Sequence, residues 1–363
     1  MRPLLAVPAV PGPALYDALR AALSGTGPAV LPVSTDPVEA ARVLAALRPD
    51  EPVEDEVALV VPTSGSTGEP KGVLLTAACL AASGSAAVAR LGGPAGWLLS
   101  LPVTHIGGLQ VVLRALAAGA DPVVVGADAT FAAATARLPA GRRCTSLVPT
   151  QLRRLLATDR DALASYDAVL VGAAATPATL LAEARAAGVR AVTTYGMSET
   201  SGGCVYDGVP IDGVDVGFDA AGRIRLGGAV VARGYRRPAP GFDGRIFTTG
   251  DVGHLDAAGR LVVDGRADDL VNTGGEKVAP AAVEAALAEH PSVVDVAVVG
   301  VPDAEWGQRV VATVVLRGPL SLEQAREHVA ARVSRVAAPR ELRVLDELPM
   351  LPTGKIDRNA LRS

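Results

Sequence analysis

One segment of the chain combines glycines, hydroxyl side chains and a lysine: Thr63-Ser64-Gly65-Ser66-Thr67-Gly68-Glu69-Pro70-Lys71-Gly72. The glycines allow a tight turn that points backbone N–H groups inward, the hydroxyls add donors, and Lys71 adds a positive charge. This set of donors suits a polyphosphate. The segment differs from the pattern GxxxxGK[ST], because Pro70 precedes the lysine and Gly72 follows it. An ordinary Ser/Gly turn is the alternative, but the expected strand before the segment and helix after it favour phosphate binding.

Lysine is scarce in this chain. Of the 34 basic residues only three are lysines, at positions 71, 277 and 355. The richness in Ala, Arg and Gly is typical of a GC-biased genome that replaces lysine with arginine wherever it is tolerated. A planar guanidinium cannot replace a compact ammonium in a small site. All three lysines lie in Gly-rich segments, so we expect them to be functional, with chance survival as the alternative for Lys277.

The glycine- and hydroxyl-rich segment resembles the phosphate-binding signature of the adenylate-forming superfamily, which includes acyl-CoA ligases, luciferases and peptide-synthetase adenylation domains. The other motifs of that family follow between Val57 and the C-terminus, and they are specific as a set although most are weak singly. They are Gly172-Ala173-Ala174-Ala175-Thr176, Tyr195-Gly196-Met197-Ser198-Glu199-Thr200, Thr249-Gly250-Asp251, Gly265-Arg266-Ala267-Asp268-Asp269, Asn272-Thr273-Gly274-Gly275-Glu276-Lys277-Val278 with Glu284, and Leu351-Pro352-Thr353-Gly354-Lys355-Ile356-Asp357-Arg358. The resemblance implies an enzyme that activates a carboxylic acid with ATP and Mg²⁺ and transfers it to coenzyme A.

The resemblance also implies the residues that bind ATP. Tyr195 would stack on adenine beside Gly196, Ser198 would touch the α-phosphate and Glu199 would bind Mg²⁺. The last role agrees with the preference of Mg²⁺ for one or two carboxylates plus phosphate oxygens. Donors for the phosphates are Thr63, Ser64, Gly65, Ser66, Thr67, Gly68 and Lys71, and Gly172 and Ala173 line the adenine. A surface turn at 195–200 and a tight strand-to-helix connection at 172–176 are the alternatives.

Further along the chain, Asp251 would accept hydrogen bonds from the ribose hydroxyls and Arg266 would reach the ribose or phosphate. This chain has Phe247-Thr248 where the family usually has Tyr-Arg, which weakens the neighbouring contacts and leaves Asp251 intact. Asp268 occupies the family's hinge position between two domains, and a solvated Asp-Asp loop is the alternative at that point.

The C-terminal motifs imply the transfer chemistry. Gly274 and Gly275 would let the pantetheine arm pass close to the backbone, and Lys277 would meet a phosphate of coenzyme A or remain a plain surface lysine. Lys355 would bridge the acyl carboxylate and the α-phosphate, neutralising charge in the transition state. A mobile, inert tail lysine is the alternative.

Fewer features of the sequence indicate which acid is the substrate. Only 62 residues precede Thr63, and the run from Thr200 to Gly208 with the short chain looks like the compact actinobacterial o-succinylbenzoate–CoA ligases of menaquinone (vitamin K2) biosynthesis. By resemblance His105 lies next to the acyl pocket, although a lone histidine in an apolar stretch is often a core residue. His105, Thr200 and Ser201 are candidates to hold the carboxylate that does not react.

Three other functions stay open. One is a general aryl- or fatty-acyl-CoA ligase. Another is a stand-alone adenylation domain that loads a carrier protein, which would usually carry an Asp near His105 that this chain lacks. The third is a non-catalytic nucleotide-binding module, which should have lost Glu199, Asp251 or Lys355, and all three are present.

The elements that must position these residues are predicted from apolar periodicity. Strands at 57–62, 97–101, 122–125, 145–148, 168–171 and 191–194 alternate with helices at 77–90, 108–118 and 177–187, which predicts an α/β fold of helix-covered, mostly parallel sheets. Short strands at 222–226, 229–233, 245–248, 254–256 and 260–264 predict a small β-barrel-like section. A small mobile α+β domain follows, with helices at 280–289 and 322–333 and strands at 293–301, 309–317 and 342–345. We therefore predict an ATP- and acyl-binding domain over 1–267 and a catalytic-lysine and CoA domain over 268–363.

The composition excludes some classes. The net charge of −4 carries no basic stripe, which argues against a nucleic-acid partner. Pro3, Pro8, Pro11 and Pro13 interrupt the N-terminal apolar run, and no apolar stretch reaches a membrane span. Three isolated cysteines fit a reducing cytoplasm. A cytoplasmic enzyme with a small-molecule acid substrate is the expectation, and a homodimer is one assembly left open.

Overall fold

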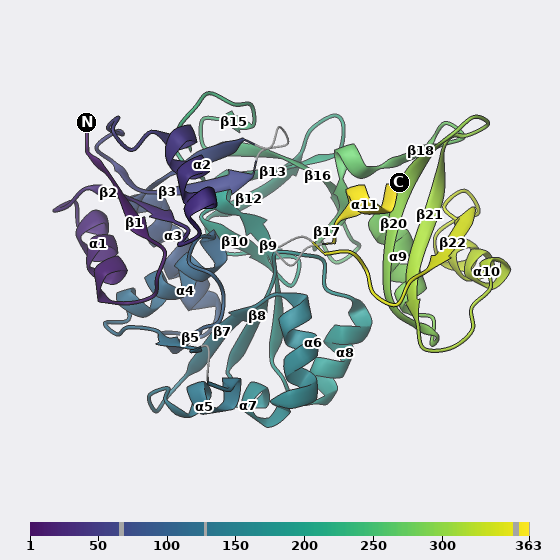
Figure 1. The fold of residues 1–363 in the computed structure, drawn as a ribbon, viewed down its shortest axis with the longest axis horizontal. Coiled ribbons are helices and arrows are strands. Elements are labelled where there is room, and N and C mark those ends of the chain that lie inside the picture. Colours follow the sequence, from purple (N-terminus) through teal and green to yellow (C-terminus); the bar gives the residue numbers. More distant parts are fainter. Residues whose placement is uncertain (65–68, 127–128, 351–355, 363) are drawn as a thin grey trace. The chain divides into compact units, whose positions relative to one another are not determined.

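The structure is a computed structural model that describes residues 1–64, 69–126, 129–350 and 356–362, without the side chain of Ser64 (Figure 1). Backbone contacts divide the chain into two compact units. The first unit holds Met1–Ala173, Ala184–Gly217 and Arg225–Thr248, and the second holds Ala174–Glu183, Phe218–Ile224 and Thr249–Ser363. The domain boundary predicted at 267/268 stays a prediction.

The N-terminal sheet of the first unit has the strand order β1-β2-β3-β4-β14. Strands β1, β2 and β3 are parallel, whereas β4 and β14 run antiparallel to their neighbours. The strands are β1 (Leu4–Pro8), β2 (Ala29–Val33), β3 (Val57–Ser64), β4 (Pro70–Thr76) and β14 (Gly234–Tyr235). Helices α1 (Pro13–Leu23) and α2 (Pro37–Leu47) connect the parallel strands and begin on proline, whose missing N–H costs nothing in the first turn.

The glycine- and hydroxyl-rich segment lies in a β-hairpin, which corrects one expectation. Strands β3 and β4 pair antiparallel with Thr63 opposite Lys71, and helix α3 (Ala77–Arg90) begins only after β4. The segment follows a strand as predicted, but the prediction that it leads directly into a helix is wrong. The apolar residues Val73, Leu74 and Leu75, all buried, form a strand of their own. Gly65, Ser66, Thr67 and Gly68 lie outside the described residues.

The second sheet of the first unit confirms the predicted βαβ alternation. Its strand order is β11-β10-β9-β8-β7-β5-β6, and the strands from β5 to β9 are parallel. The strands are β5 (Gly96–Leu99), β6 (Val123–Val124), β7 (Arg143–Leu147), β8 (Ala168–Val171), β9 (Ala191–Met197), β10 (Gly202–Tyr206) and β11 (Val209–Pro210). The helices are α4 (Ile106–Ala117), α5 (Phe131–Ala136), α6 (Pro149–Thr158), α7 (Arg160–Ala164) and α8 (Ala178–Ala186). Helices α3 and α4 pack against β10, and α4 also contacts β5 and β7.

Antiparallel strands follow, as predicted, with two differences: the strands predicted at 245–248 and 254–256 are parts of one continuous strand, and no strand forms at 229–233. The strands are β12 (Val214–Phe218), β13 (Arg223–Gly228), β15 (Phe242–Asp243), β16 (Ile246–Leu255) and β17 (Leu261–Arg266). Strands β16 and β17 form a hairpin, and the Asp256 carboxylate closes its turn by accepting hydrogen bonds from the N–H groups of Ala258 and Arg260. The strand predicted at 229–233 is wrong, because that segment is a turn whose backbone groups bond elsewhere.

The C-terminal part of the second unit is the expected α+β structure. Its strand order is β19-β18-β21-β20, with β22 beside β21. The elements are β18 (Val271–Thr273), β19 (Glu276–Val278), α9 (Pro280–Ala288), β20 (Val293–Asp303), β21 (Gly307–Leu316), α10 (Leu322–Arg332), β22 (Glu341–Val344) and α11 (Arg358–Arg362). Val283 and Leu287 of α9 pack with Val298 of β20 and Val329 of α10 in one buried core.

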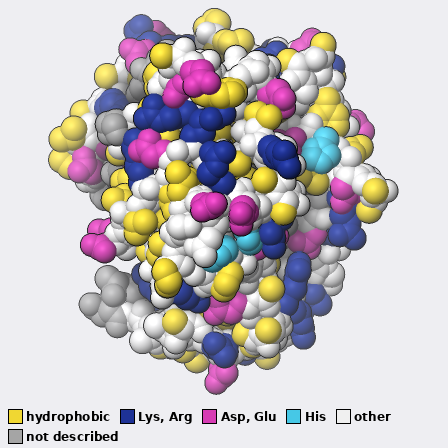
Figure 2. Space-filling view, turned by 90° about the vertical axis from the view of Figure 1, so that its right-hand side faces the viewer, with side chains coloured by type: hydrophobic (Ala, Val, Ile, Leu, Met, Phe, Trp, Pro, Cys, Tyr) yellow, Lys and Arg dark blue, Asp and Glu magenta, His cyan; other side chains and the backbone are white. Residues whose placement is uncertain are grey.

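Charges of both signs are mixed on the second unit. Arg309 and Arg343 both pair with Glu341, and Arg332 pairs with Glu289. Acidic side chains lie among the basic ones on the face drawn in Figure 2. Within the described ranges, no helix has the length and apolar character needed to cross a bilayer.

Candidate active site

Two predicted adenine-binding segments lie side by side in the first unit. Strands β8 and β9 are parallel neighbours, with Val171 opposite Thr193, so Gly172 and Tyr195 follow at the same edge of the sheet. Ligands of α/β sheets bind at this edge. A Cβ on Gly172 would lie 2.3 Å from the hydroxyl oxygen of Thr194, so only glycine fits. Ala173 adopts a left-handed backbone with φ 67°, which turns the chain sharply after β8.

A turn of 3₁₀ helix, η1 (Ser198–Thr200), follows β9 and holds the predicted phosphate and metal residues. The side chains of Ser198 and Glu199 are largely buried, at 8% and 9% exposed. Ser201 then takes a left-handed conformation with φ 55°, and its N–H donates to the carbonyl of Ser198. The chain can therefore turn back directly into β10, which pairs Gly203 with Gly196.

Thr200 and Ser201, predicted to hold the substrate, are fully buried. The Thr200 hydroxyl lies 2.9 Å from the carbonyl oxygen of Gly202, and the Ser201 hydroxyl donates to the carbonyl of Val230 at 2.7 Å. Each hydroxyl has one hydrogen to donate, and the structure directs it to the backbone. Their substrate role stays a prediction.

Lys71 lies in β4 beside Tyr235 of β14. Its ammonium nitrogen is 5.3 Å from the centroid of the Tyr235 ring, which is a cation–π contact. The Tyr235 hydroxyl donates to Oε1 of Glu199 at 2.7 Å. Burial, followed by the negative charge of Glu199, raises the pKa of Tyr235, so the phenol stays protonated and remains a donor. Tyr235 was not among the predicted site residues, although it lies in a Gly-rich stretch of a chain with only five tyrosines.

His105 lies exposed at the N-cap position of α4, so it is not a core histidine. The buried side of this helix carries two polar residues, one turn apart. The Gln110 amide donates to the carbonyl of Ser201 at 2.5 Å, which joins the helix to the turn that carries Glu199.

Arg114 is the second polar residue on that side and is only 4% exposed. It donates to the Tyr206 hydroxyl at 3.2 Å and lies 5.2 Å from the centroid of the Trp97 ring. Its Nε has no hydrogen-bond partner, and no carboxylate pairs with it among the described residues. Arg114 was not among the predicted site residues, although it is the single charged residue in the apolar stretch from Ile106 to Ala117.

The predicted ribose-binding residues lie together in the second unit. Asp251 of β16 is paired with Arg266 of β17, and Arg266 Nη1 lies 3.6 Å from Asp251 Oδ1. A Cβ on Gly250 would lie 2.7 Å from the Arg266 guanidinium, so the glycine makes room for it. Asp268, the predicted hinge, lies in the 3₁₀ turn η2 (Ala267–Asp269), and its side chain is 84% exposed.

The predicted CoA segment is a tight hairpin between β18 and β19. Gly274 and Gly275, with φ 62° and 83°, are the two turn residues, as a type I′ turn requires. Lys277 is exposed in β19. Glu284 pairs with Arg358 at 2.7 Å and accepts the Val298 N–H, so its carboxylate serves the packing of α9 and α11.

Lys355 lies outside the described residues. The residues that flank the segment 351–355 pair with each other. Met350 and Ile356 form a β-bridge, and the N–H of Asp357 donates to the carbonyl of Pro349.

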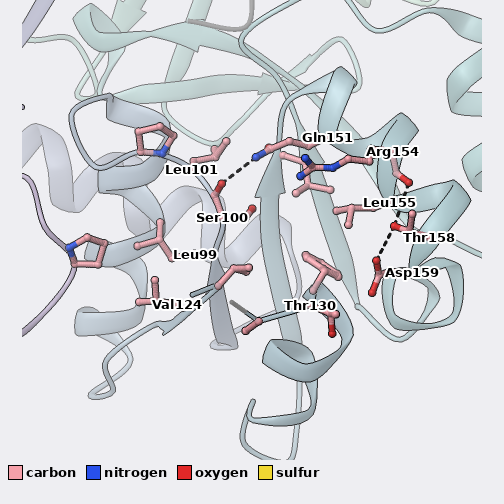
Figure 3. Close-up of a pocket in the computed structure, with 16 residues that line it drawn as sticks. Leu99, Ser100, Leu101, Val124, Thr130, Gln151, Arg154, Leu155, Thr158 and Asp159 are labelled. Atoms are coloured by element: carbon pink, nitrogen blue, oxygen red, sulfur yellow. Dashed lines mark hydrogen bonds between the residues drawn. The ribbon is translucent and has the colours of Figure 1, made fainter. Parts of the chain in front are cut away.

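A cavity of about 470 Å³ opens elsewhere in the first unit, at the carboxyl ends of β5, β6 and β7 (Figure 3). Leu99, Leu101, Val124 and Leu155 give it apolar walls, and Arg154 and Asp159 are its charged residues. Of the predicted site residues that the structure describes, none lines it.

Comparison with known proteins decides the family. The AMP-binding enzyme family matches residues 17–266, and the AMP-binding enzyme C-terminal domain matches residues 282–355. The chain belongs to the AMP-binding enzyme family. The family motifs identified in the sequence lie within or close to these two matches.

Relatives of this chain are CoA ligases of several acids. The chain is 50% identical to a probable 2-succinylbenzoate–CoA ligase of Mycobacterium tuberculosis, over 96% of this chain and 94% of the relative. It is 36% identical to an indoleacetate–CoA ligase of Aromatoleum aromaticum, over 84% of this chain and 66% of the relative.

Solved structures with the same fold include o-succinylbenzoate CoA synthetase (MenE) from Bacillus subtilis in complex with the acyl-adenylate intermediate OSB-AMP. The TM-score is 0.76 at 25% identity, covering 99% of this chain and 83% of that one. E. coli MenE with a bound analogue of OSB-AMS aligns with a TM-score of 0.75 at 28% identity, covering 99% of this chain and 86% of that one. The predicted enzyme class is thereby confirmed: the chain is an adenylate-forming acid–CoA ligase, with ATP and coenzyme A as co-substrates.

Proposed function

We propose that this enzyme joins o-succinylbenzoate to coenzyme A, with release of AMP and pyrophosphate, in menaquinone biosynthesis. The observation that carries the proposal is the 50% identity to a probable 2-succinylbenzoate–CoA ligase over nearly the full length of both chains. We place the reaction in the cytoplasm, where ATP and coenzyme A are available.

In the first half-reaction, a carboxylate oxygen of the acid attacks the α-phosphorus of ATP and pyrophosphate leaves in line. Positioning and charge neutralisation dominate such a step. Lys71 and the donors of segment 63–68 hold the phosphates, Ser198 contacts the α-phosphate, and Lys355 neutralises charge that develops at the reacting centre.

A Mg²⁺ ion fits the carboxylate of Glu199. Glu199 is buried, accepts one hydrogen bond from Tyr235, and has no ion-pair partner among the described residues. No group of three or more metal-binding side chains occurs in the described part of the chain, so phosphate oxygens and water would supply the other ligands, as Mg²⁺ prefers. When bound, the ion would neutralise phosphate charge.

In the second half-reaction, the sulfur of coenzyme A attacks the acyl carbonyl carbon, the bond to AMP breaks, and the thiol proton passes to solvent. We assign Gly274 and Gly275 to the passage of the pantetheine arm, because their turn has no side chain to obstruct it. Asp268 would be the hinge. Between the two steps, a rotation about it would withdraw Lys355 from the reacting centre and bring this turn there instead. During both steps the adenine would stay bound to Tyr195, Gly172 and Ala173. The ribose would stay bound to Asp251 and Arg266.

The second carboxylate of o-succinylbenzoate needs a positive partner. Arg114 is a buried guanidinium without a carboxylate partner in the described ranges, and its Nε has no acceptor. Leaving a buried cation unpaired is costly, which supports pairing with an anion brought by the substrate. We therefore propose that Arg114 recognises the carboxylate that does not react.

A substrate panel tests the proposal. With ATP, Mg²⁺ and coenzyme A, the enzyme should form AMP and acyl-CoA in equal amounts from o-succinylbenzoate, and far more slowly from benzoate, indoleacetate or octanoate. If one of those monocarboxylates is the better substrate, the general acyl-CoA ligase function replaces this one.

A further inference from the structure

Among the described residues, the side chain that hydrogen-bonds the Glu199 carboxylate is Tyr235 of the distant strand β14. Oε1 of Glu199 accepts a hydrogen bond from the Tyr235 hydroxyl at 2.7 Å, although the two residues are 36 positions apart in the sequence. An ionised carboxylate can accept about four hydrogen bonds or metal bonds. One bond therefore fixes its orientation and leaves most of its acceptor sites for a ligand.

The same tyrosine contacts the lysine assigned to the phosphates. The Lys71 ammonium lies over the Tyr235 ring at 5.3 Å from the centroid. Among the described residues, no ion pair joins Lys71 to Glu199 or to any other carboxylate. A direct ion pair between Lys71 and Glu199 would have neutralised both groups. Tyr235 instead contacts the lysine with its ring and the carboxylate with its hydroxyl, and the two charges stay separate.

Tyr235 is fixed by its own surroundings. Strand β14 places it opposite Val73 of β4, two residues from Lys71. The ring meets Phe242 edge-on at 5.0 Å. The next residue, Arg236, donates to the carbonyls of Arg48 and Glu51 at 2.7 and 2.6 Å, which ties β14 to the end of α2.

We propose that Tyr235 is a positioning residue that orients the Glu199 carboxylate for the metal of MgATP and keeps Lys71 available to the phosphates. The proposal rests on the proposed metal role of Glu199. Loss of a residue that orients a metal ligand typically costs about 10–100-fold in metal affinity. The hydroxyl, rather than the ring, should carry this effect.

The test uses Tyr235→Phe, which keeps the ring and removes the hydroxyl. Tyr166→Phe is the matched control, because it also removes a buried hydroxyl hydrogen bond, to Thr135 at 2.8 Å, and Tyr166 lies in the loop between α7 and β8, which holds no predicted site residue. Calorimetric titration of ATP at increasing Mg²⁺, without acid or coenzyme A, gives the Mg²⁺ concentration at half-maximal ATP affinity.

We expect Tyr235→Phe to raise that Mg²⁺ concentration about 10-fold or more, with ATP affinity in EDTA unchanged and AMP formation recovered at high Mg²⁺. Tyr166→Phe should keep the wild-type Mg²⁺ dependence even if its melting temperature falls. In a Glu199→Gln background, Tyr235→Phe should add no further change, because the carboxylate it orients is gone.

The proposal is overturned if Tyr235→Phe shows the Mg²⁺ dependence of the wild type or of Tyr166→Phe, or if its effect persists in Glu199→Gln. These titrations need no acid. They therefore judge Tyr235 even if o-succinylbenzoate proves not to be a substrate, a result that would reject the proposed function alone.

Discussion

At the scale of single residues, the first unit holds three charged side chains that are candidates for binding a ligand. Glu199, Lys71 and Arg114 have no oppositely charged side-chain partner among the described residues. Several exposed arginines do have such a partner, as Arg332 has in Glu289. A charge without a counterion in a protected position is the usual mark of a ligand site.

Replacing Arg114 tests the recognition of the second carboxylate. Arg114→Met should raise the KM for o-succinylbenzoate about 10–100-fold, as expected for the loss of a charged hydrogen bond, with little change for benzoate. Arg114→Lys should recover part of the loss, because it restores the charge without the planar fork. Equal effects on both acids would assign Arg114 to the packing of α4 alone.

Lys355→Ala tests the terminal lysine. We expect acyl-adenylate formation to fall about 100-fold or more, as for loss of a group that stabilises developing charge. Thioester formation from supplied acyl-AMP should be spared. Rapid-quench assays of the two half-reactions measure this, and equal loss of both would refute the assigned role.

The sequence predicted these residues unevenly. The three lysines stood out because lysine is scarce, and Glu199, Asp251 and Lys355 lay in motifs of known order. Tyr235 and Arg114 carried no such motif. Their partners, Glu199 and Tyr206, are 36 and 92 positions away in the sequence. Contacts between residues this far apart form only when the chain folds, so local sequence patterns did not predict them.

At the scale of elements, long apolar strands were predictable and short strands beside glycines were not. Helix α3 and strand β8 occupy the predicted residues, because strong periodicity sets their limits. The segment at 229–233 looks like a strand, but tertiary bonds use its backbone. The Val230 carbonyl accepts from Ser201, and the Ala232 N–H donates to the Glu199 carbonyl. The segment therefore holds the turn that carries Glu199, the proposed metal ligand, instead of extending a sheet.

Gly172→Ala tests the close approach of β8 and β9. The new Cβ would lie 2.3 Å from the Thr194 hydroxyl, and we expect a loss of about 1–3 kcal/mol in unfolding free energy with weaker ATP binding. Adding Thr194→Ala should restore part of the lost unfolding free energy and part of the lost ATP affinity, because it removes the clashing oxygen.

Gly84→Ala is the control for that change. Gly84 lies within α3 and nothing lies within 4 Å of its added Cβ, so alanine should stabilise the helix slightly. Denaturant titration measures all the variants. A neutral Gly172→Ala would show that the β8–β9 contact yields easily and that glycine is not required there.

At the scale of the whole molecule, the chain divides its functions between two compact units. The predicted adenine and metal residues lie in the first, and Asp251, Arg266 and the Gly274–Gly275 turn lie in the second. Composition and periodicity predicted the fold of each part. They do not show whether the parts rotate relative to one another, which stays a prediction from the family resemblance.

Asp268→Pro tests the hinge. Proline fixes φ near −65°, so we expect one half-reaction to slow about 10-fold or more while the other stays near the wild-type rate, as when a gating motion is restricted. Asp268→Ala is the control, since it removes the same exposed carboxylate and leaves φ free. If both variants slow both half-reactions equally, Asp268 is not a hinge.

The central claim is that the acid is converted to an adenylate before coenzyme A takes part. Exchange of labelled pyrophosphate into ATP measures this step directly, because it reports the reverse of adenylate formation. We predict exchange that requires o-succinylbenzoate and Mg²⁺ and proceeds without coenzyme A. Exchange that appears only when coenzyme A is present, or that is absent while acyl-CoA still forms, would contradict the account.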